Sequence, residues 1–254
     1  MLKLSQSLGV NTESKAFNNF SVIFDGGDEY IDCGDSAELS FTNDTTDSAF
    51  SVSLWVNFAA VDAIQGLFGK INSGNQEYFM KFHSDNYIWF RLFDDSSGGK
   101  IGVKTTGVTF ATDTWYNVVA TYDGSDASSG LNIYVNNVDR TSRTSSGSYT
   151  SMENTTAPLT LGVQQSTSQY LNGVLDEVTF WNIELSAAQV STLYNSSYPV
   201  DPRVLFGVNT NLAAYWRMGD DSVHPTIIDS SIDNNDGTMT NMAAANIVAD
   251  VPQQ

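Results

Sequence analysis

The clearest pattern in the sequence is an alternation of apolar and polar side chains with a period of two. Such a period is typical of a β-strand with one covered face. The strongest example is the segment 50–58, where the apolar face carries Phe50, Val52, Leu54, Val56 and Phe58. The segment 87–93 alternates in the same way, but both of its faces are apolar enough to be covered.

Shorter segments with strand-like composition recur along the rest of the chain. Polar turns rich in Gly, Ser and Asp separate them, at the spacing expected of a β-sandwich or barrel. Together with the two segments above they predict an all-β protein. The further strands are predicted at 21–26, 77–82, 115–124, 131–138, 158–163 and 173–181.

Two local motifs add a hairpin and a helix to this pattern. Asn136-Asn137 lies at the end of a predicted strand and predicts a tight turn, because Asn accepts positive φ better than most residues. The segment 185–195 predicts one short helix, in which Ser186 is the N-cap and Gln189 completes a capping box.

Two prolines, Pro199 and Pro202, interrupt the pattern and suggest a boundary. We therefore divide the chain into an N-terminal arm (1–19), a β-sandwich (20–198) and a C-terminal segment (199–254). The C-terminal segment contains about two predicted strands, too few for a stable domain. It is expected to complete the sandwich or to contact a neighbouring subunit.

The charge balance narrows the range of partners. The chain has 11 Lys and Arg against 29 Asp and Glu, a net charge of −18. Binding to nucleic acid depends on clustered Lys and Arg, so nucleic acid is an improbable partner, and the same argument applies to anionic membranes and sulfated glycans. An acidic loop surface favours a divalent cation, above all calcium.

Cysteine content and hydropathy bear on location. The single cysteine, Cys33, allows no intrachain disulfide. Residues 1–19 contain no apolar run of signal-peptide length, and no segment is apolar over the length of a membrane span. We expect a protein that is not inserted in a membrane and is not exported by its own N-terminus.

The order of several motifs resembles a laminin G-like domain of the concanavalin A-like superfamily. The resemblance covers about residues 20–198 and implies a jelly-roll β-sandwich of two antiparallel sheets. Members of that family often hold a calcium ion at the rim of the sandwich, and Asp25 and Asp176 stand at the matching motif positions. Both carboxylates have the alternative role of capping backbone amides. The motifs are FDG (24–26), FSVSLWVN (50–57), WYNVVATYDG (115–124), GLNIYVNNV (130–138) and LNGVLDEVTFWNIELSAAQVSTLYN (171–195).

The C-terminal segment departs from that family pattern. AYWRMGDD (214–221) with DSSIDNNDGT (229–238) resembles the opening of such domains, yet here it lies at the end of the sequence. This implies a permuted or completing arrangement, or the start of a truncated second copy. The whole combination is similar to structural proteins of tailed phages of marine bacteria, which implies release by lysis and a place on the virion surface.

No catalytic pattern stands out. Related glucanases carry a Glu-x-Asp-x-x-Glu strand, which is absent here. Glu177 is paired only with Asp176, and adjacent residues of a regular strand point to opposite faces. His83 and His224 lie in no nucleophile motif. We therefore expect no enzymatic activity.

Aromatic residues bear on carbohydrate binding, because sugars stack their apolar faces on rings. Trp89, Tyr87 and Arg91 fall on the less apolar face of their strand, and Tyr78 is expected nearby, so these four are candidate carbohydrate contacts. Alternatively, the rings fill a second side of the sandwich that loops cover.

Two functions follow from these observations. The first is a non-catalytic virion structural or surface protein, such as a capsid decoration or a tail or fibre component, with a laminin G-like adhesion module. Its partners would be other virion proteins or further copies of itself, and host cell-surface glycans. The alternative is a lectin-like carbohydrate-binding module of a bacterial surface or secreted protein, which would reach the outside by a route other than its own signal peptide.

Overall fold

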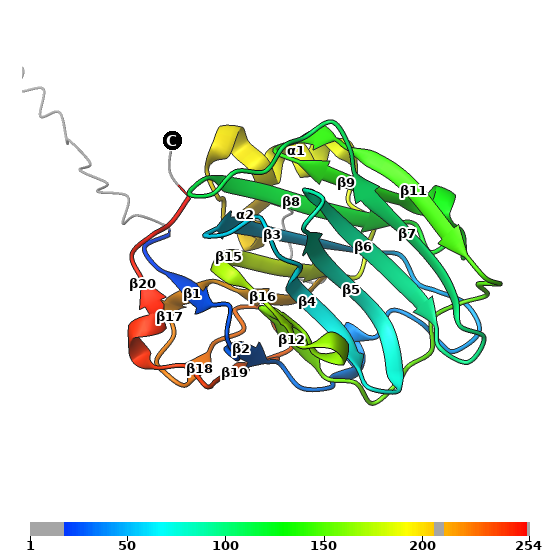
Figure 1. Cartoon of the computed structure of the whole chain (residues 1–254), viewed down its shortest axis with the longest axis horizontal. Coiled ribbons are helices and arrows are strands. Elements are labelled where there is room, and N and C mark those ends of the chain that lie inside the picture. The colour runs from blue at the N-terminus through cyan, green and yellow to red at the C-terminus, as the bar shows by residue number, and fades with distance from the viewer. Residues whose placement is uncertain (1–17, 206–210, 253–254) are drawn as a thin grey trace, which may run out of the picture.

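Two large antiparallel sheets, A and B, stack face to face in the computed structural model, which describes residues 18–205 and 211–252 (Figure 1). Sheet A has the order β10-β9-β8-β3-β15-β1-β20, with β16 also beside β15. Its strands are β1 (Ser21–Asp25), β3 (Phe50–Phe58), β8 (Trp115–Tyr122), β9 (Leu131–Val135), β10 (Val138–Asp139), β15 (Asn172–Trp181), β16 (Leu212–Trp216) and β20 (Ile247–Val248).

Sheet B has the order β11-β7-β6-β5-β4-β12-β2-β19-β18. Its strands are β2 (Tyr30–Asp32), β4 (Gln65–Asn72), β5 (Asn75–His83), β6 (Tyr87–Asp94), β7 (Gly99–Thr105), β11 (Thr141–Ser146), β12 (Leu159–Leu161), β18 (Thr226–Ile227) and β19 (Gly237–Thr240). A separate two-stranded hairpin pairs β13 (Val163–Gln164) with β14 (Gln169–Tyr170).

The hydrophobic core lies between the inner faces of the two sheets. Alternate residues of the long central strands, such as β3, β5, β6 and β8, point into it, as the period of two predicts. The fold has one free cysteine, Cys33, and no disulfide among its described residues. Burial of the aromatic rings in this core therefore supplies the main stabilisation. Fully buried core rings include Phe24, Phe50, Phe58, Phe68, Phe82, Phe90 and Phe180.

Strand β3 is buried on both faces, which corrects the prediction of a half-covered strand. Its inner face carries the five predicted apolar residues. The outer face is covered by the segment that follows β15: the Ser51 hydroxyl donates to the carbonyl of Ile183 over 2.9 Å, and Trp55 stacks on Tyr194 with ring centroids 6.0 Å apart. The cover comes from residues more than 100 positions away, so the local pattern could not reveal it.

The helix and the hairpin form where the sequence predicts them. Helix α1 (Ala187–Tyr194) begins after Ser186, whose side chain and that of Gln189 form both bonds of the capping box. Asn136 and Asn137 have φ of 50° and 63° in the turn between β9 and β10. A second, short helix, α2 (Pro202–Leu205), follows the predicted boundary.

Strands β4 and β11 escaped prediction because they lack a simple apolar alternation. Strand β4 contains two glycines and the fully buried Lys70, which forms an ion pair of 2.9 Å with Glu77. Strand β11 has the polar sequence TSRTSS and is an edge strand held by its pairing with β7. Backbone pairing to neighbours stabilises such strands without an apolar face of their own.

Residues of the C-terminal segment join both sheets. Strand β16 pairs with β15, β19 pairs with β2, and β20 pairs with β1, while β17 (Met218–Asp221) lies near β1. Figure 1 shows these orange and red elements beside the blue strands of the N-terminal part. Most of the predicted N-terminal arm, residues 1–17, lies outside the described residues. No helix within 18–205 or 211–252 is long and apolar enough to cross a membrane.

Candidate functional site

The outer face of sheet B carries a strip of rings and cations across β5, β6 and β7. The pairing of the strands sets its geometry: Lys81 lies opposite Trp89, which lies opposite Lys104, and Arg91 lies between Phe79 and Gly102. Neighbouring strands are about 4.8 Å apart, so the strip is roughly 10 Å wide. We define the outer strip as Phe79, Lys81, Tyr87, Trp89, Arg91, Phe93, Lys100 and Lys104.

Arg91 and Trp89 form the centre of the outer strip. The guanidinium carbon of Arg91 lies 3.4 Å from the centroid of the Trp89 ring, a cation–π stack. Arg91 Nε and Trp89 Nε1 are both buried, and neither has a hydrogen-bond partner among the described residues. Burial lowers the pKa of Arg91 to about 10. The predicted set Tyr87, Trp89 and Arg91 therefore lies on one face, as the alternation requires.

Tyr78 does not belong to this group, and its prediction as a carbohydrate contact is corrected. It lies opposite Leu92 in the register of β5 and β6, so its side chain points into the core and is fully buried. Its hydroxyl donates to the carbonyl of Leu39 over 2.7 Å, which satisfies the one polar atom of the ring.

The hairpin β13–β14 lies beside the outer strip. It packs so closely on β4 that a Cβ at Gly66 would come within 2.1 Å of the backbone nitrogen of Gln164, which is why glycine is required there. Lys81 Nζ donates to the side-chain oxygens of Gln164 and Gln169 over 3.1 and 3.2 Å. The hairpin thus forms a polar wall along one side of the strip.

A cavity of about 270 Å³ opens at the rim of the sandwich, on the other side of the same hairpin. Its volume is close to the lower end of the roughly 300–1,000 Å³ typical of small-molecule sites. Carboxylate, amide and hydroxyl groups dominate its lining, and Gln169 links it to the outer strip through Lys81. The polar and aromatic side chains that line it include those of Asp25, Asp62, Gln65, Gln169, Tyr170 and Asn172.

Of these rim residues, only Asp25 was predicted from the sequence as a site residue. The others come from the loop after β3, from β4, and from β14 and the start of β15, which pairing alone brings together. Each of these segments shows only the polar composition of an ordinary strand end, so no sequence signal distinguished them.

The two predicted calcium ligands lie apart. Asp25 is opposite Asn172 on β15, four residues from Asp176, a separation of roughly 13 Å along the strand. Asp25 accepts from the amide of Gly27 over 2.7 Å, and Asp176 accepts from the amide of Glu177 over 2.8 Å and from Asn18 Nδ2 over 2.6 Å. Over the described ranges, no group of three or more His, Cys, Asp or Glu side chains is arranged to hold a metal ion.

Asp176 and Glu177 lie on the same face of sheet A, contrary to the expectation of opposite faces. The pairing of β15 with β3 shifts between Asp176 and Thr179, and Glu177 has a φ of 48°. This β-bulge adds a residue to one strand, so both carboxylates turn outward. Burial raises the pKa of Glu177 to about 8, although a hydrogen bond from Tyr215 and the charge of Arg217 lower it.

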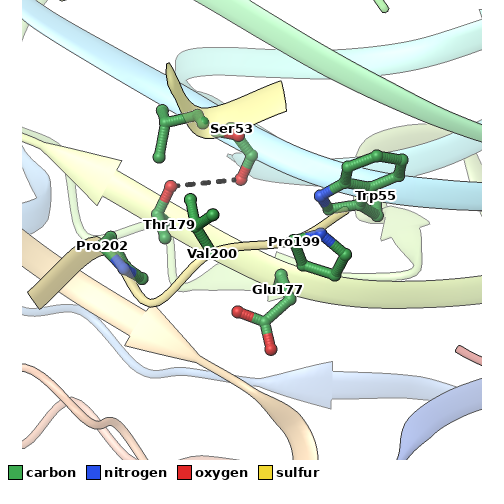
Figure 2. Close-up of a pocket in the computed structure, with 8 residues that line it drawn as sticks. Ser53, Trp55, Glu177, Thr179, Pro199, Val200 and Pro202 are labelled. Carbon is green, nitrogen blue, oxygen red and sulfur yellow. Dashed lines mark hydrogen bonds between the residues drawn. The ribbon is translucent and has the colours of Figure 1, made fainter. Parts of the chain in front are cut away.

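The outward side of Glu177 is closed. Figure 2 shows it with Trp55, Thr179 and Ser53 of sheet A, beneath the segment that carries Pro199, Val200 and Pro202. The remaining void is only about 10 Å³, room for roughly one water molecule. This buried acid pair therefore has no space for a sugar.

Residues 25–191 match a laminin G-type family model, described as the concanavalin A-like lectin/glucanases superfamily. The sandwich of two antiparallel sheets is consistent with this match. The chain belongs to this superfamily. The match confirms the fold class and the resemblance from which it was predicted. No curated protein shows significant sequence similarity to the chain.

Two solved structures illustrate the likeness of this laminin G-type sandwich to others. A protein of Bacteroides ovatus ATCC 8483, described as a candidate carbohydrate binding protein, matches 92% of this chain with 19% identity and a TM-score of 0.63, and the match covers 61% of that protein's chain. The CBM40 module of the Ruminococcus gnavus IT-sialidase, solved with α2,3-sialyllactose, matches 68% of this chain and 96% of its own, with 12% identity and a TM-score of 0.51. At such identities the likeness concerns the fold alone.

Proposed function

We propose that the protein is a non-catalytic carbohydrate-binding module that holds a sugar in the rim cavity. This is the alternative of the two functions that the sequence predicts. The observation that carries it is the cavity of about 270 Å³ with its polar lining and one aromatic ring. The superfamily and the two solved carbohydrate-binding neighbours support it.

The lining of the rim cavity suits the chemistry of a sugar. Asp62 offers acceptors to hydroxyl groups, and the amides of Gln65 and Asn172 offer both donors and acceptors. Tyr170, which is partly exposed, adds a ring edge or face for the apolar side of a pyranose. A small-molecule site usually combines an aromatic surface with a small number of polar groups that point toward the ligand.

Binding without turnover is favoured by the position of Glu177, a buried carboxyl whose pKa burial raises to about 8. A retaining or inverting glycosidase needs an acid of this kind facing a second carboxylate across a sugar-sized gap. Glu177 instead faces a void of about 10 Å³ beneath Pro199 and Val200. A proton donor so enclosed has no route to a glycosidic oxygen.

A glycan array with the full chain tests the proposal. We expect binding to at least one glycan, and we expect Tyr170→Ala to weaken it by about tenfold or more, as loss of a buried stacking ring does. Tyr198→Ala is the matched control, because that tyrosine is exposed elsewhere on the surface. A folded protein that binds no glycan, or a Tyr170→Ala variant that binds as well as the unmodified chain, would contradict the proposal.

The virion role remains a separate hypothesis. It is compatible with sugar binding, because an adhesion module on a particle would use the same cavity to hold a host glycan. Detecting the protein in a purified particle, and measuring its size in solution, would test it independently of any glycan.

A further inference from the structure

The cations of this acidic protein are unevenly distributed. Of its 11 Lys and Arg residues, four lie on the outer strip, although the net charge of the chain is −18. None of the four forms an ion pair with an acidic side chain among the described residues. The acidic residue Asp85 lies close to Tyr87 of the strip, but its carboxylate pairs with His83 and not with one of these four cations. The four are Lys81, Arg91, Lys100 and Lys104.

Each of these cations lies over a ring instead of beside an acid. Arg91 lies 3.4 Å from the centroid of Trp89, and the three lysines lie between 5.0 and 5.7 Å from the centroids of their rings. A ring face holds a cation in place but does not neutralise its charge. The strip therefore keeps four positive charges that form no ion pair with an acidic side chain in residues 18–205 or 211–252.

The centre of the strip has unsatisfied donors and mutual repulsion. Arg91 Nε is buried with no partner in the described part of the chain, an arrangement that costs free energy unless a ligand completes it. Within the described part of the chain, Lys81 donates to two neutral amide oxygens, those of Gln164 and Gln169. Burial lowers the pKa of Lys81, and the charge of Arg91 lowers it further. An anion placed between Lys81 and Arg91 would relieve both penalties.

Arg91 has small neighbours on the side away from Lys81. On the side of β7, the residue opposite Arg91 is Gly102, which has no side chain, and the next strand presents Thr144 there. Arg91, Trp89, Lys81 and Lys104 are all partly exposed. The flat guanidinium, fixed on the indole, presents its edge as a fork that matches a carboxylate or a sulfate.

We propose that the outer strip binds the anionic groups of an acidic glycan, a polysaccharide bearing carboxylates or sulfates, with Arg91 at the centre and Lys81 and Lys104 on either side. This inference rests on the proposed function, because it assigns a charge class to the glycan. It also revises the argument from net charge, which disfavoured sulfated glycans. Charges in water are screened within about 8–10 Å, so a local cluster decides what binds next to it.

Two matched pairs of polymers test the charge class. Binding of the full chain to polygalacturonate is compared with binding to its methyl ester, which has the same backbone without the charge, and dextran sulfate is compared with dextran. We expect the acidic member of at least one pair to bind about tenfold or more tightly, and the preference to fall with added salt. The first pair reports carboxylates and the second reports sulfates.

A matched pair of variants tests the position. Arg91→Gln is expected to lower the affinity for the preferred acidic polymer by about tenfold, while the affinity for its neutral partner stays the same. Arg143→Gln removes the same charge from β11 and is expected to change the affinity less than about twofold. Arg143 lies opposite the inward-facing Val103 in the strand register, and its side chain donates to Asn132. Thermal midpoints of both variants check that they fold.

The outcomes separate the two proposals. If acidic and neutral polymers bind alike, or if a neutral glycan binds on the array and no acidic polymer binds, the inference is wrong and the proposed function stands. If the acidic preference survives in Arg91→Gln, the anion binds elsewhere and the inference is again wrong. If the folded protein binds neither the polymers nor any glycan on the array, both proposals fail.

Discussion

Arg91 covers one face of the Trp89 indole, with its guanidinium carbon 3.4 Å from the ring centroid. The sequence predicted Trp89 as a platform for sugar stacking, but on this side the ring supports a cation. The consequence for recognition is a change of chemistry. The indole orients a charged group, and under our proposal that guanidinium is the part of the strip that meets the acidic glycan.

Removing the ring should therefore weaken the binding of an acidic polymer through Arg91. We expect Trp89→Leu to lower the affinity for the preferred acidic polymer by about 3–10-fold, because the cation–π contact contributes about 0.5–2 kcal/mol and its loss frees the guanidinium to move. Titration calorimetry measures the effect. Trp115→Leu, which removes a partly exposed indole from sheet A, is the control and should leave the affinity unchanged.

The rim cavity is lined by two carboxylates, Asp25 and Asp62. Hydrolysis of a glycosidic bond, if it occurred, would be expected at this pair. We expect no release of new reducing ends from any glycan that the protein binds, in the unmodified chain or in Asp62→Asn. Paired carboxylates are the usual machinery of glycosidases, which makes this the decisive place to look. Reducing ends that appear with the unmodified chain and disappear in Asp62→Asn would show that the protein is an enzyme.

Calcium provides a separate test of Asp25 and Asp176. Because these side chains lie at different places on β1 and β15, we expect them not to share an ion. Any rise of the thermal midpoint on adding calcium should be the same in Asp176→Asn as in the unmodified protein, measured against a chelator. A rise that both Asp25→Asn and Asp176→Asn abolish would show that the two carboxylates act on one ion.

Stability should fall as pH rises because of Glu177. Its ordinary pKa of 4.5 is raised by burial to about 8, so between these values the folded protein keeps a proton that the unfolded chain releases. The unfolding free energy then decreases with pH by up to about 1.4 kcal/mol per unit for this group, and the loss is complete above the folded pKa.

Glu177→Gln should flatten that slope, because an amide does not titrate and its oxygen still accepts from Tyr215. Part of the slope should remain, since burial also raises the pKa of Asp176. Urea denaturation between about pH 5 and 9 measures both proteins. An equal slope in the two would mean that Glu177 is not protonated in the fold.

The buried pair of Lys70 and Glu77 should be essential for stability. Lys70 Nζ lies 2.9 Å from Glu77 and donates to the carbonyl of Ala157 over 2.8 Å, and Glu77 also accepts from the amide of Thr155 over 2.9 Å. We expect Lys70→Met to lower the unfolding free energy by about 3–5 kcal/mol, because it leaves a buried carboxylate unpaired.

The pH dependence of that loss checks its cause. Burial raises the pKa of Glu77, so at acid pH the unpaired carboxyl can take up a proton, and Lys70→Met should be less damaging there. Adding Glu77→Gln to Lys70→Met should recover part of the stability at neutral pH. A loss of equal size at every pH would point to packing and not to the unpaired charge.

The sequence by itself determined the local elements of this protein. A period of two placed Phe50 and Phe58 on the core face of β3, Ser186 and Gln189 set the start of α1, and Asn136-Asn137 set a turn. These features depend on side chains a few residues apart, which interact through the geometry of a single strand, helix or turn. The order of such motifs was also enough to indicate the superfamily.

Only the tertiary structure decided which side chains meet. The outer strip exists because the register of β5, β6 and β7 aligns Lys81, Trp89 and Lys104, and the rim cavity exists because distant strand ends converge. A single bulge turned Glu177 to the face of Asp176, against the alternation of the sequence. Register and bulges are set by pairing between segments far apart in the chain, and that information is not present in the local pattern of any one strand.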